Sequence, residues 1–577
     1  MEFGHRAGEA SARVEVVRPA DIVFRGGVVR TQCAERPEVQ AVAVRDGLIA
    51  GLGSDEETGA FIGPRTRVVE LAGRALLPGF ADAHAHVQQA VSFVHAINLY
   101  ECHSVAGYLE AVAMAAAAHP GRPVVLGNGW SEVLLPGAGP SKTDLDDIEA
   151  GRPVALWSDG HHSLWVNSEA LRVIGLDGNS PDPRTGVIER VPDTVGRPGC
   201  LYGEPSGTLR ESAAETAMTR LPDFSVEEYC DGIRYFQDTI ARPRGITLAH
   251  DPVCLPGSNA VAAYAKLAAT GELTMRVRGS VQVFPEAPLG PQIEAAVAEK
   301  ARHVGELFQI TAVKIFTDGT IEGHTGYLNA DYADRPGFRG RPIWDSDALA
   351  EACRAADLAG LQIHVHAIGD AALGQALDGL ESMVTANGAR ARRSMITHWQ
   401  VVDPRDVIRA ARLDVVSLVQ PYWFVRDIYY DRGGLPCLGA ARAEREFPMR
   451  SLFAAGMRPA SSSDFPVTPS PDPLVGMQGG VMRWLPESVF GGAVEPPGDV
   501  WSEEAVTVEQ MIETFTINGA QANYLESTTG SLEVGKSADV IVLARDPLRC
   551  AHAEIARGNK VLLTMLQGRE VYRAPGF

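Results

Sequence analysis

The sequence predicts an α/β fold: a (β/α)8 barrel of the TIM type, with a small β-sandwich built from both chain ends and an insertion after the first barrel strand. Three observations support this fold. Apolar strand-like segments alternate with Ala-rich helical segments through the middle of the chain. Short strand patterns separated by glycine occur at both ends. One interval between middle strands is too long to hold a single helix.

The composition indicates an ordinary globular protein. Hydrophobic residues make up 45% of the 577 residues and charged residues 21%. The net charge of −20 argues against a nucleic-acid partner, because the protein would repel its phosphates. The eight cysteines include no Cys-x-x-Cys pair, which favours a reduced, cytoplasmic protein.

Two further patterns concern membranes and secretion. Residues 1–20 form a mixed charged and polar tail that lacks the apolar core of a signal peptide. The chain has no run of about 18 apolar residues, so we expect no membrane-spanning segment. We therefore expect no membrane partner, and a homodimer is the default oligomer for a soluble protein of this size.

Both ends of the chain predict one composite β-sandwich domain, formed by residues 21–75 and 526–577. Glycine turns separate short strand patterns in each part. Pairing the two ends in this way closes a small domain around the middle of the chain.

Residues 76–525 predict the barrel. Its eight candidate strands are 76–86, 245–251, 275–281, 311–318, 361–370, 394–400, 414–422 and 458–466. The long interval 90–244 contains strand patterns of its own, so we interpret it as a subdomain inserted over the barrel mouth. In such barrels the chemistry lies at the C-terminal ends of the strands, where ligand-type residues are therefore of most interest.

The first candidate strand ends in a His-x-His pair, His84 and His86. Residues two apart in a strand project to the same face, so both imidazoles can reach one point. Imidazole is the commonest protein ligand for zinc-like ions. Surface or core histidines give the same pattern, so the pair alone is a weak indication of a metal site.

Four more ligand-type residues follow at later strand ends. Lys314 lies in an apolar strand, where it either forms a salt bridge to Asp318 or Glu322 or is carboxylated and bridges metal ions. The others are His366, which is nearer its strand end than His364, then His398 and Asp464. The order His-x-His, Lys, His, His, Asp at the ends of strands one, four, five, six and eight predicts a metal centre.

These segments resemble the metal-dependent amidohydrolase superfamily, and within it the amidohydrolase family 3 branch that includes N-substituted formamide deformylases. The resemblance extends from about Asp21 to Tyr572. It is carried by 77–86, 127–130, 159–168, 313–320, 366–372, 462–464 and 530–539. It implies that the metal site consists of His84, His86, Lys314, His366, His398 and Asp464, with one or two divalent ions, most often zinc.

The substrate side of the predicted site rests on five residues. His162 and Trp130 lie in branch-like segments of the insertion, and both either line the pocket or pack within the insertion. His324 stands where relatives often carry a Ser-Arg-Thr type sequence, which puts the polarity of the substrate in doubt. Trp423 and Phe424 follow strand seven and are candidates for an apolar wall. His161 is not distinguished from His162 by sequence.

The resemblance implies a hydrolase that cleaves a C–N amide bond of a small molecule, of the N-substituted formamide or acyl amide type, with metal-activated hydroxide. Asp464 would act as base and then as acid, and His398 or His162 would assist the oxyanion. The alternatives are a cyclic amide hydrolase, an aminohydrolase (deaminase), and a non-catalytic regulatory barrel.

Overall fold

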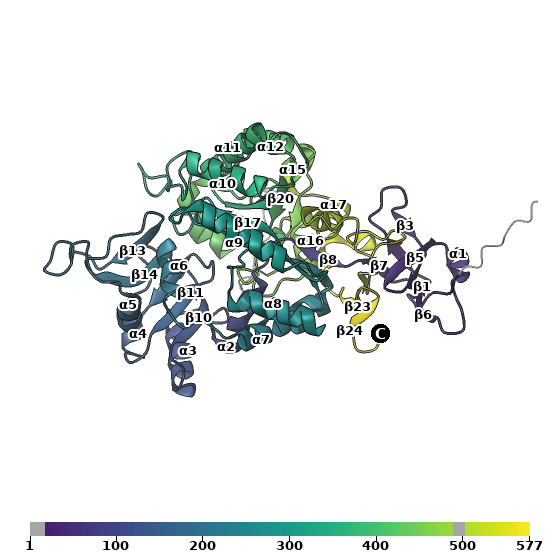
Figure 1. The fold of residues 1–577 in the computed structure, drawn as a ribbon, viewed down its shortest axis with the longest axis horizontal. Coiled ribbons are helices and arrows are strands. Elements are labelled where there is room, and N and C mark those ends of the chain that lie inside the picture. Colours follow the sequence, from purple (N-terminus) through teal and green to yellow (C-terminus); the bar gives the residue numbers. More distant parts are fainter. Residues whose placement is uncertain (1–17, 488–501) are drawn as a thin grey trace, which may run out of the picture.

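The computed structural model describes residues 18–487 and 502–577, and three parts follow one another along its long axis (Figure 1). Strands from both chain ends form a β-structure at one end of the molecule. The barrel lies in the middle. A separate mixed sheet with its own helices lies at the other end, and it comes from the insertion predicted at 90–244.

The middle part is a nearly closed parallel barrel, as the sequence predicts. Each neighbouring pair of its strands is parallel. In sheet order the strands are β8 (Phe80–Asp82), β15 (Ile246–Asp251), β16 (Arg276–Gln282), β17 (Phe308–Phe316), β18 (Gln362–Ala367), β19 (Met395–His398), β20 (Val416–Val419) and β21 (Ala460–Ser461). The backbone N–H of Ala83 donates to the carbonyl of Ser461 at 3.1 Å, which brings the first and last strands together.

The strand expected over 76–86 is divided into two. β7 (Ala75–Pro78) pairs with strands of the terminal sheets, and β8 starts the barrel at Phe80 rather than at residue 76. Gly79 separates them, and a Cβ there would lie 2.2 Å from Thr247 Oγ1, so only glycine fits this close approach. His84 and His86 consequently lie in the segment after β8 and not within a strand.

Amphipathic helices surround the barrel and cover its outer face. Alternation along β18 places Ile363 and Val365 against them, in one apolar core with Leu377, while His364 and His366 face the interior. The helices around the strands are α7 (Val226–Phe236), α8 (Asn259–Thr270), α9 (Leu289–Arg302), α10 (Ser346–Leu358), α11 (Asp370–Asn387), α12 (Pro404–Arg412), α15 (Met449–Ala454), α16 (Pro473–Met482), α17 (Val508–Thr514) and α18 (Ile517–Ala522).

The terminal part consists of two sheets around a common core. One has the order β5-β4-β1-β6 and the other β24-β23-β22-β7-β2-β3. Phe24 and Val42 from the start of the chain share this core with Val540 and Leu563 from its end. The strands are β1 (Ile22–Arg25), β2 (Val28–Arg30), β3 (Glu38–Val39), β4 (Ala41–Arg45), β5 (Leu48–Gly53), β6 (Arg67–Glu70), β22 (Val540–Leu543), β23 (Val561–Leu566) and β24 (Arg569–Arg573).

The insertion contains a six-stranded mixed sheet with the order β13-β14-β12-β11-β10-β9. Two apolar clusters pack around it, one with α5 (Ser168–Ile174) and α6 (Ser212–Met218) and one with α3 (Val105–Ala118). The strands are β9 (Ile97–Asn98), β10 (Val125–Trp130), β11 (Val154–Ser158), β12 (Ser163–Val166), β13 (Gly186–Arg190) and β14 (Pro205–Glu211).

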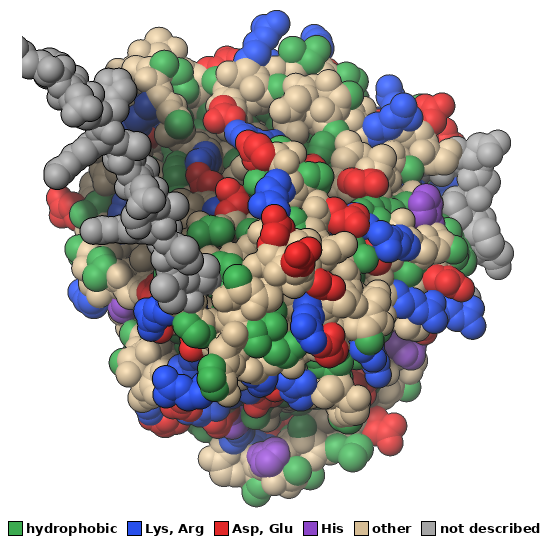
Figure 2. Space-filling model, turned by 90° about the vertical axis from the view of Figure 1, so that its right-hand side faces the viewer, with side chains coloured by type: hydrophobic (Ala, Val, Ile, Leu, Met, Phe, Trp, Pro, Cys, Tyr) green, Lys and Arg blue, Asp and Glu red, His purple; other side chains and the backbone are tan. Residues whose placement is uncertain are grey.

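The surface at the terminal end carries both signs of charge. Figure 2 shows Lys and Arg side chains interspersed with Asp and Glu side chains over this face. Such mixing gives no single-sign field over the face in view. Among the residues that the structure describes, no helix has the length and apolar character needed to cross a bilayer.

Candidate metal centre

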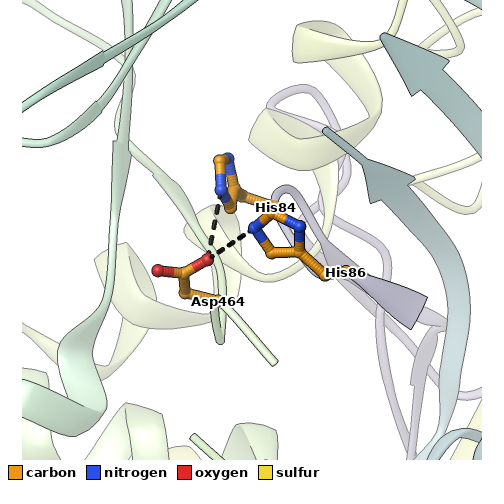
Figure 3. Close-up of side chains that lie close together, drawn as sticks. All are labelled: His84, His86 and Asp464. Carbon is orange, nitrogen blue, oxygen red and sulfur yellow. Dashed lines mark ion pairs between the residues drawn. The ribbon is translucent and has the colours of Figure 1, made fainter. Parts of the chain in front are cut away.

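Three side chains converge at the barrel mouth: His84, His86 and Asp464 (Figure 3). Asp464 Oδ1 lies 3.2 Å from His84 Nε2 and 3.3 Å from His86 Nε2. The ligand atoms of all three lie within 4.8 Å of one another. The backbone N–H of Asp464 donates to the carbonyl of His84 at 2.8 Å, so the two segments that carry these groups are fixed to each other.

Two further imidazoles, His366 and His398, meet beside this cluster. His398 Nε2 lies 3.0 Å from His366 Nδ1. The outer nitrogens of both rings face acceptors: His366 Nε2 lies 3.2 Å from the carbonyl of Gly319, and His398 Nδ1 lies 3.1 Å from Gln420 Oε1. A neutral imidazole has one N–H, which donates to the outer acceptor. The two inner nitrogens therefore present lone pairs to each other.

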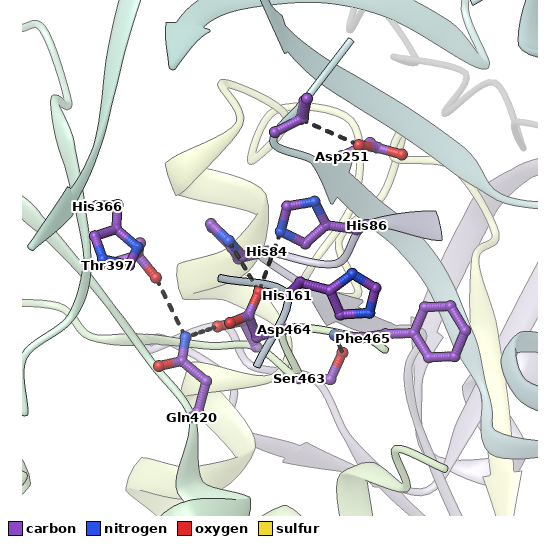
Figure 4. Close-up of polar contacts among 12 residues, drawn as sticks. His84, His86, His161, Asp251, His366, Thr397, Gln420, Ser463, Asp464 and Phe465 are labelled. Carbon is purple, nitrogen blue, oxygen red and sulfur yellow. Dashed lines mark hydrogen bonds and ion pairs between the residues drawn. The ribbon is translucent and has the colours of Figure 1, made fainter. Parts of the chain in front are cut away.

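Gln420 determines this arrangement for His398, and Figure 4 shows Gln420 with its partner Thr397. Its amide nitrogen donates to Thr397 Oγ1 at 3.2 Å and to Ser462 Oγ at 2.7 Å. Ser462 Oγ donates its own proton to the carbonyl of Val419 at 3.2 Å, so it accepts from the Gln420 amide nitrogen. The Gln420 oxygen is then the atom that faces His398, and it can only accept. Two facing lone pairs repel unless a cation lies between them, so this geometry suits a metal ion.

Lys314 lies in the barrel interior on β17, in register with His364 of β18 and Gln282 of β16. Its Nζ is buried, has no hydrogen-bond partner and lies 4.6 Å from the ring centroid of Phe316. Burial lowers the pKa of Lys314 to about 7.

The salt bridge that was one alternative for Lys314 is not formed within the described residues. Asp318 instead accepts the backbone N–H groups of Tyr327, Ile368 and Gly369. Glu322 forms no ion pair with Lys314 either, and Lys314 remains a buried amine without an anionic partner. Such a group is costly to bury unless it is neutral or modified.

The protonation states of the histidines suit a divalent cation. Burial lowers the pKa values of His84 and His366 well below the usual range and that of His398 to about 4. All three are therefore neutral near pH 7, the form in which imidazole binds metals. Neutral nitrogens together with one carboxylate oxygen are the donor types that zinc prefers. The residues present thus fit such an ion.

A cavity of about 730 Å³ opens directly onto these groups, and all six predicted ligands line it. Much of its wall is apolar, from residues such as Trp157, Phe224, Phe284 and Trp344. Besides Asp464, its lining carboxylates are Glu211, Glu215, Asp223 and Glu286. Among the described lining residues, the one Lys or Arg is Lys314 at the centre itself.

His162 is brought to the centre by the insertion. Its ring centroid lies 5.2 Å from that of His366, and its Nδ1 lies 2.8 Å from Glu211 Oε2. Burial alone would lower the pKa of His162, but the Glu211 carboxylate raises it to about 9. His162 is therefore an imidazolium at neutral pH. The neighbouring His161 contacts the Tyr100 hydroxyl at 3.1 Å, and burial lowers its pKa to about 3.

Trp423 lies on the opposite side of the histidines. Its ring stacks on His398 with centroids 5.7 Å apart, and its Nε1 donates to Thr468 Oγ1 at 3.0 Å. It lines a second, smaller cavity of about 110 Å³ that also reaches His366, His398 and Asp464. Trp423 therefore forms part of the wall of the candidate site.

Three residues predicted to contact substrate line neither of these cavities. Trp130 is fully buried in the insertion, where its Nε1 donates to the carbonyl of Leu156 at 2.8 Å. Phe424 is 1% exposed and packs against Phe447. His324 pairs with Asp334 at 2.8 Å. Their side chains contact other protein groups outside the two cavities, so their contact with substrate stays a prediction.

Some residues at the centre could not be identified from the sequence. Glu211 comes 49 residues after His162, and no local pattern links them. Gln420 follows a buried strand without any ligand-type signal. The one feature of the sequence that could have indicated them is their place at the end of a strand. Gln420 follows β20, and Glu211 ends β14.

Known proteins are similar to this chain over most of its length. The model of a family described as the amidohydrolase family matches residues 67–572. The amidohydrolase YtcJ of Bacillus subtilis (strain 168) is 30% identical over 95% of this chain and 99% of its own length. The N-substituted formamide deformylase of Arthrobacter pascens is 26% identical over 96% of this chain and 99% of its own length.

Among solved structures, an uncharacterized metal-dependent hydrolase from Pyrococcus horikoshii OT3 has a TM-score of 0.69. It covers 92% of this chain and 99% of its own, at 23% sequence identity. This likeness supports the fold alone.

Proposed function

This chain belongs to the amidohydrolase family and is a metal-dependent hydrolase of C–N bonds, and from that premise we propose that it hydrolyses small N-substituted formamides or acyl amides. The observation that carries the proposal is the convergence of Asp464 Oδ1 on His84 Nε2 and His86 Nε2 at the floor of the large cavity. These groups offer a ligand set and a proton acceptor at the same point.

We propose that His84, His86, Lys314, His366, His398 and Asp464 hold one or two divalent ions, with zinc as the preferred metal. Such an ion polarises a carbonyl and lowers the pKa of water from about 15.7 to roughly 7. Lys314 would take part as a carboxylated side chain. Its neutral amine attacks carbon dioxide, a C–N bond forms, one proton is released, and the product is an anionic carbamate. Burial supports this step because it favours the neutral amine.

Asp464 is the proton carrier in this proposal. Its carboxylate is 6% exposed at the cavity floor, so it can take a proton from an attacking water. It then returns that proton to the leaving nitrogen when the C–N bond breaks. One group that acts first as a base and then as an acid balances the proton count of amide hydrolysis.

His162 is the proposed donor to the substrate oxygen. Its Nδ1–H is held by Glu211, and the charged ring lies against His366 at the cavity wall. An imidazolium N–H in a buried site stabilises negative charge as it develops on the carbonyl oxygen. Glu211 keeps the ring charged and oriented.

The cavity favours neutral or cationic substrates with an apolar body. Trp157, Phe224 and Trp344 offer apolar surface to such a body. The carboxylates Asp223 and Glu286 would repel an anionic substrate, and the described lining offers no arginine to pair with one.

The test is a comparison of three matched N-alkylformamides on zinc-loaded protein, with formate release as the measurement. The alkyl group ends in a methyl, an ammonium or a carboxylate. We expect turnover of the first two and a kcat/KM at least 10-fold lower for the carboxylate. Release of ammonia from an aminopurine instead would indicate a deaminase, and ring opening of a cyclic amide would indicate the other hydrolase alternative. Absence of turnover with all of these would favour a regulatory barrel.

A further inference from the structure

Beneath the candidate metal centre, five buried side chains form one continuous hydrogen-bonded chain across the barrel interior. His84 Nδ1 lies 2.8 Å from His364 Nε2, and His364 Nδ1 lies 3.2 Å from Ser280 Oγ. Ser280 Oγ lies 2.7 Å from His250 Nε2, and His250 Nδ1 lies 2.7 Å from Asn523 Oδ1. The members come from β15, β16, β18, the segment after β8 and the end of α18.

The far end of this chain has a fixed polarity. The amide nitrogen of Asn523 donates to the carbonyl of Gly519 at 2.9 Å. A carbonyl only accepts, so the amide oxygen must be the atom that faces His250. His250 therefore carries its proton on Nδ1 and donates it to Asn523.

The donor and acceptor of each further hydrogen bond in this series then follow from the one before it. His250 and His364 are fully buried and neither contacts a carboxylate, so each ring is neutral and has one N–H. With its proton on Nδ1, His250 accepts through Nε2 from the Ser280 hydroxyl. Ser280 Oγ in turn accepts from His364 Nδ1–H. His364 Nε2 is then an acceptor, and His84 must donate to it from Nδ1.

We infer that His364, Ser280, His250 and Asn523 are positioning residues that fix the tautomer of His84, so that its Nε2 lone pair faces Asp464 and the metal. The inference rests on the metal centre required by the proposed function. The lone pair of His84 Nε2 then lies 3.2 Å from the carboxylate oxygen Asp464 Oδ1, and a cation is needed between these two acceptors. Without these four hydrogen-bonded residues, His84 would carry its proton on either ring nitrogen. Its Nε2 lone pair would then be available to the metal for only part of the time.

Groups that hold a metal-binding histidine by its second nitrogen typically contribute 10- to 100-fold to metal affinity. In other proteins a single carboxylate or carbonyl does this. Here the holding group is a second histidine, which itself needs a defined tautomer. Ser280 therefore acts on the metal through two imidazole rings, those of His364 and His84. Asn523 acts through these two and the ring of His250, and neither residue contacts the metal directly.

The experiment measures the affinity of metal-free full-length protein for zinc, by competition with a chromophoric chelator. Ser280→Ala should weaken zinc binding about 10- to 100-fold, and Ser280→Thr, which keeps the hydroxyl, should restore it. Asn523→Leu removes the polarity at the far end and should weaken binding in the same direction. Asn523→Leu also tests the positioning role if Ser280→Ala does not fold.

Ser417→Ala is the matched control. Ser417 is a buried serine on β20 of the same barrel, and its Oγ has no hydrogen-bond partner among residues 18–487 and 502–577. We expect its loss to leave the zinc affinity unchanged. The visible spectrum of the cobalt-loaded proteins should shift for Ser280→Ala and Asn523→Leu and not for Ser417→Ala, which a mere packing defect would not produce.

Two results are decisive against the inference, and they are distinguishable. Wild-type zinc affinity in Ser280→Ala and Asn523→Leu, with unchanged cobalt spectra, would overturn the positioning role and leave the proposed function intact. Failure of the wild-type protein itself to bind zinc or cobalt would overturn the metal centre, and the positioning role with it.

Discussion

Asp464 has two proposed roles among the residues of the site. It contacts both histidines of the His-x-His pair as a metal ligand, and it carries the proton. Asp464→Asn keeps an oxygen donor but removes the proton acceptor. We predict that metal content stays near that of the wild type while kcat falls by at least about 10²- to 10⁴-fold. Both are measured on the same preparation. Near-full turnover would remove Asp464 from the proton transfer.

The ion pair between His162 and Glu211 predicts a pH dependence. The pKa of His162 is raised to about 9, so the charged form persists from low pH and is lost as the pH rises through about 9. Activity should therefore fall on an alkaline limb near pH 9. His162→Gln should lose that limb and lower kcat by about 10²-fold.

His161→Gln is the control for this pH profile. His161 lines the same cavity, but burial lowers its pKa to about 3, so it does not titrate in the alkaline range. The limb should persist in this variant. A limb that is unchanged in His162→Gln would show that another group sets it.

Individual residues differ in how far the sequence predicted them. The strand ends indicated His84, His366, His398 and Asp464, because a ligand type at a strand end is visible in the chain itself. Lys314 stood out because a lysine is costly in an apolar strand. Trp130 and Phe424 were expected in the pocket wall, and the structure buries both outside the two cavities. Sequence does not tell which neighbours a large aromatic side chain packs against.

At the scale of elements, the position of His86 depends on helix packing. His86 precedes the short helices η1 (Val87–Ala90) and α2 (Val91–His95), which pack against α7 at Gly232. A Cβ at Gly232 would lie 2.3 Å from the backbone nitrogen of Val91 and 2.4 Å from its Cα. Gly232→Ala therefore must push these helices away from α7.

We predict that Gly232→Ala destabilises the protein by about 1–3 kcal/mol, the usual cost of overpacking, and weakens zinc binding. Thermal unfolding of the metal-free protein and zinc competition measure the two effects. Gly290→Ala in α9 is the control, since no described atom outside its own helix backbone and chain neighbours lies within 4 Å of the position of its Cβ. Equal behaviour of the two variants would contradict the proposed link between α7 and His86.

The eight barrel strands were predictable because apolar strand patterns alternate with helical ones, and the structure confirms the barrel. The division of the first strand was not, because residues 76–86 read as one strand that ends in the His-x-His pair. The break at Gly79 is set by Thr247, which is distant in sequence. Long-range contacts of this kind leave no local signal.

At the scale of the whole molecule, a buried ion pair joins the barrel to the terminal sheets. Arg276 on β16 donates from Nε to Asp539 Oδ2 at 2.8 Å, and both side chains have zero exposure. Asp539→Asn removes the buried anion and leaves Arg276 with Glu306, whose side chain is 64% exposed, 3.1 Å from its Nη1. We predict a loss of about 3–5 kcal/mol in the free energy of unfolding, measured by urea denaturation.

The exposed ion pair between Arg67 and Glu570 provides the control. It also lies in the terminal sheets, but its side chains are 47% and 27% exposed. Glu570 also pairs with Arg573, which is 33% exposed. Glu570→Gln should cost no more than about 1 kcal/mol, because water screens both pairs. Similar losses in both variants would show that the buried pair has no special role in joining the two parts.

The central claim is that the strand ends of the barrel hold a metal centre, and metal content per chain tests it most directly. Full-length protein is purified without chelator or affinity metal and analysed by mass spectrometry. We expect one to two equivalents of zinc or a similar divalent ion per chain. Protein that remains metal-free after incubation with zinc, manganese and bicarbonate would contradict it.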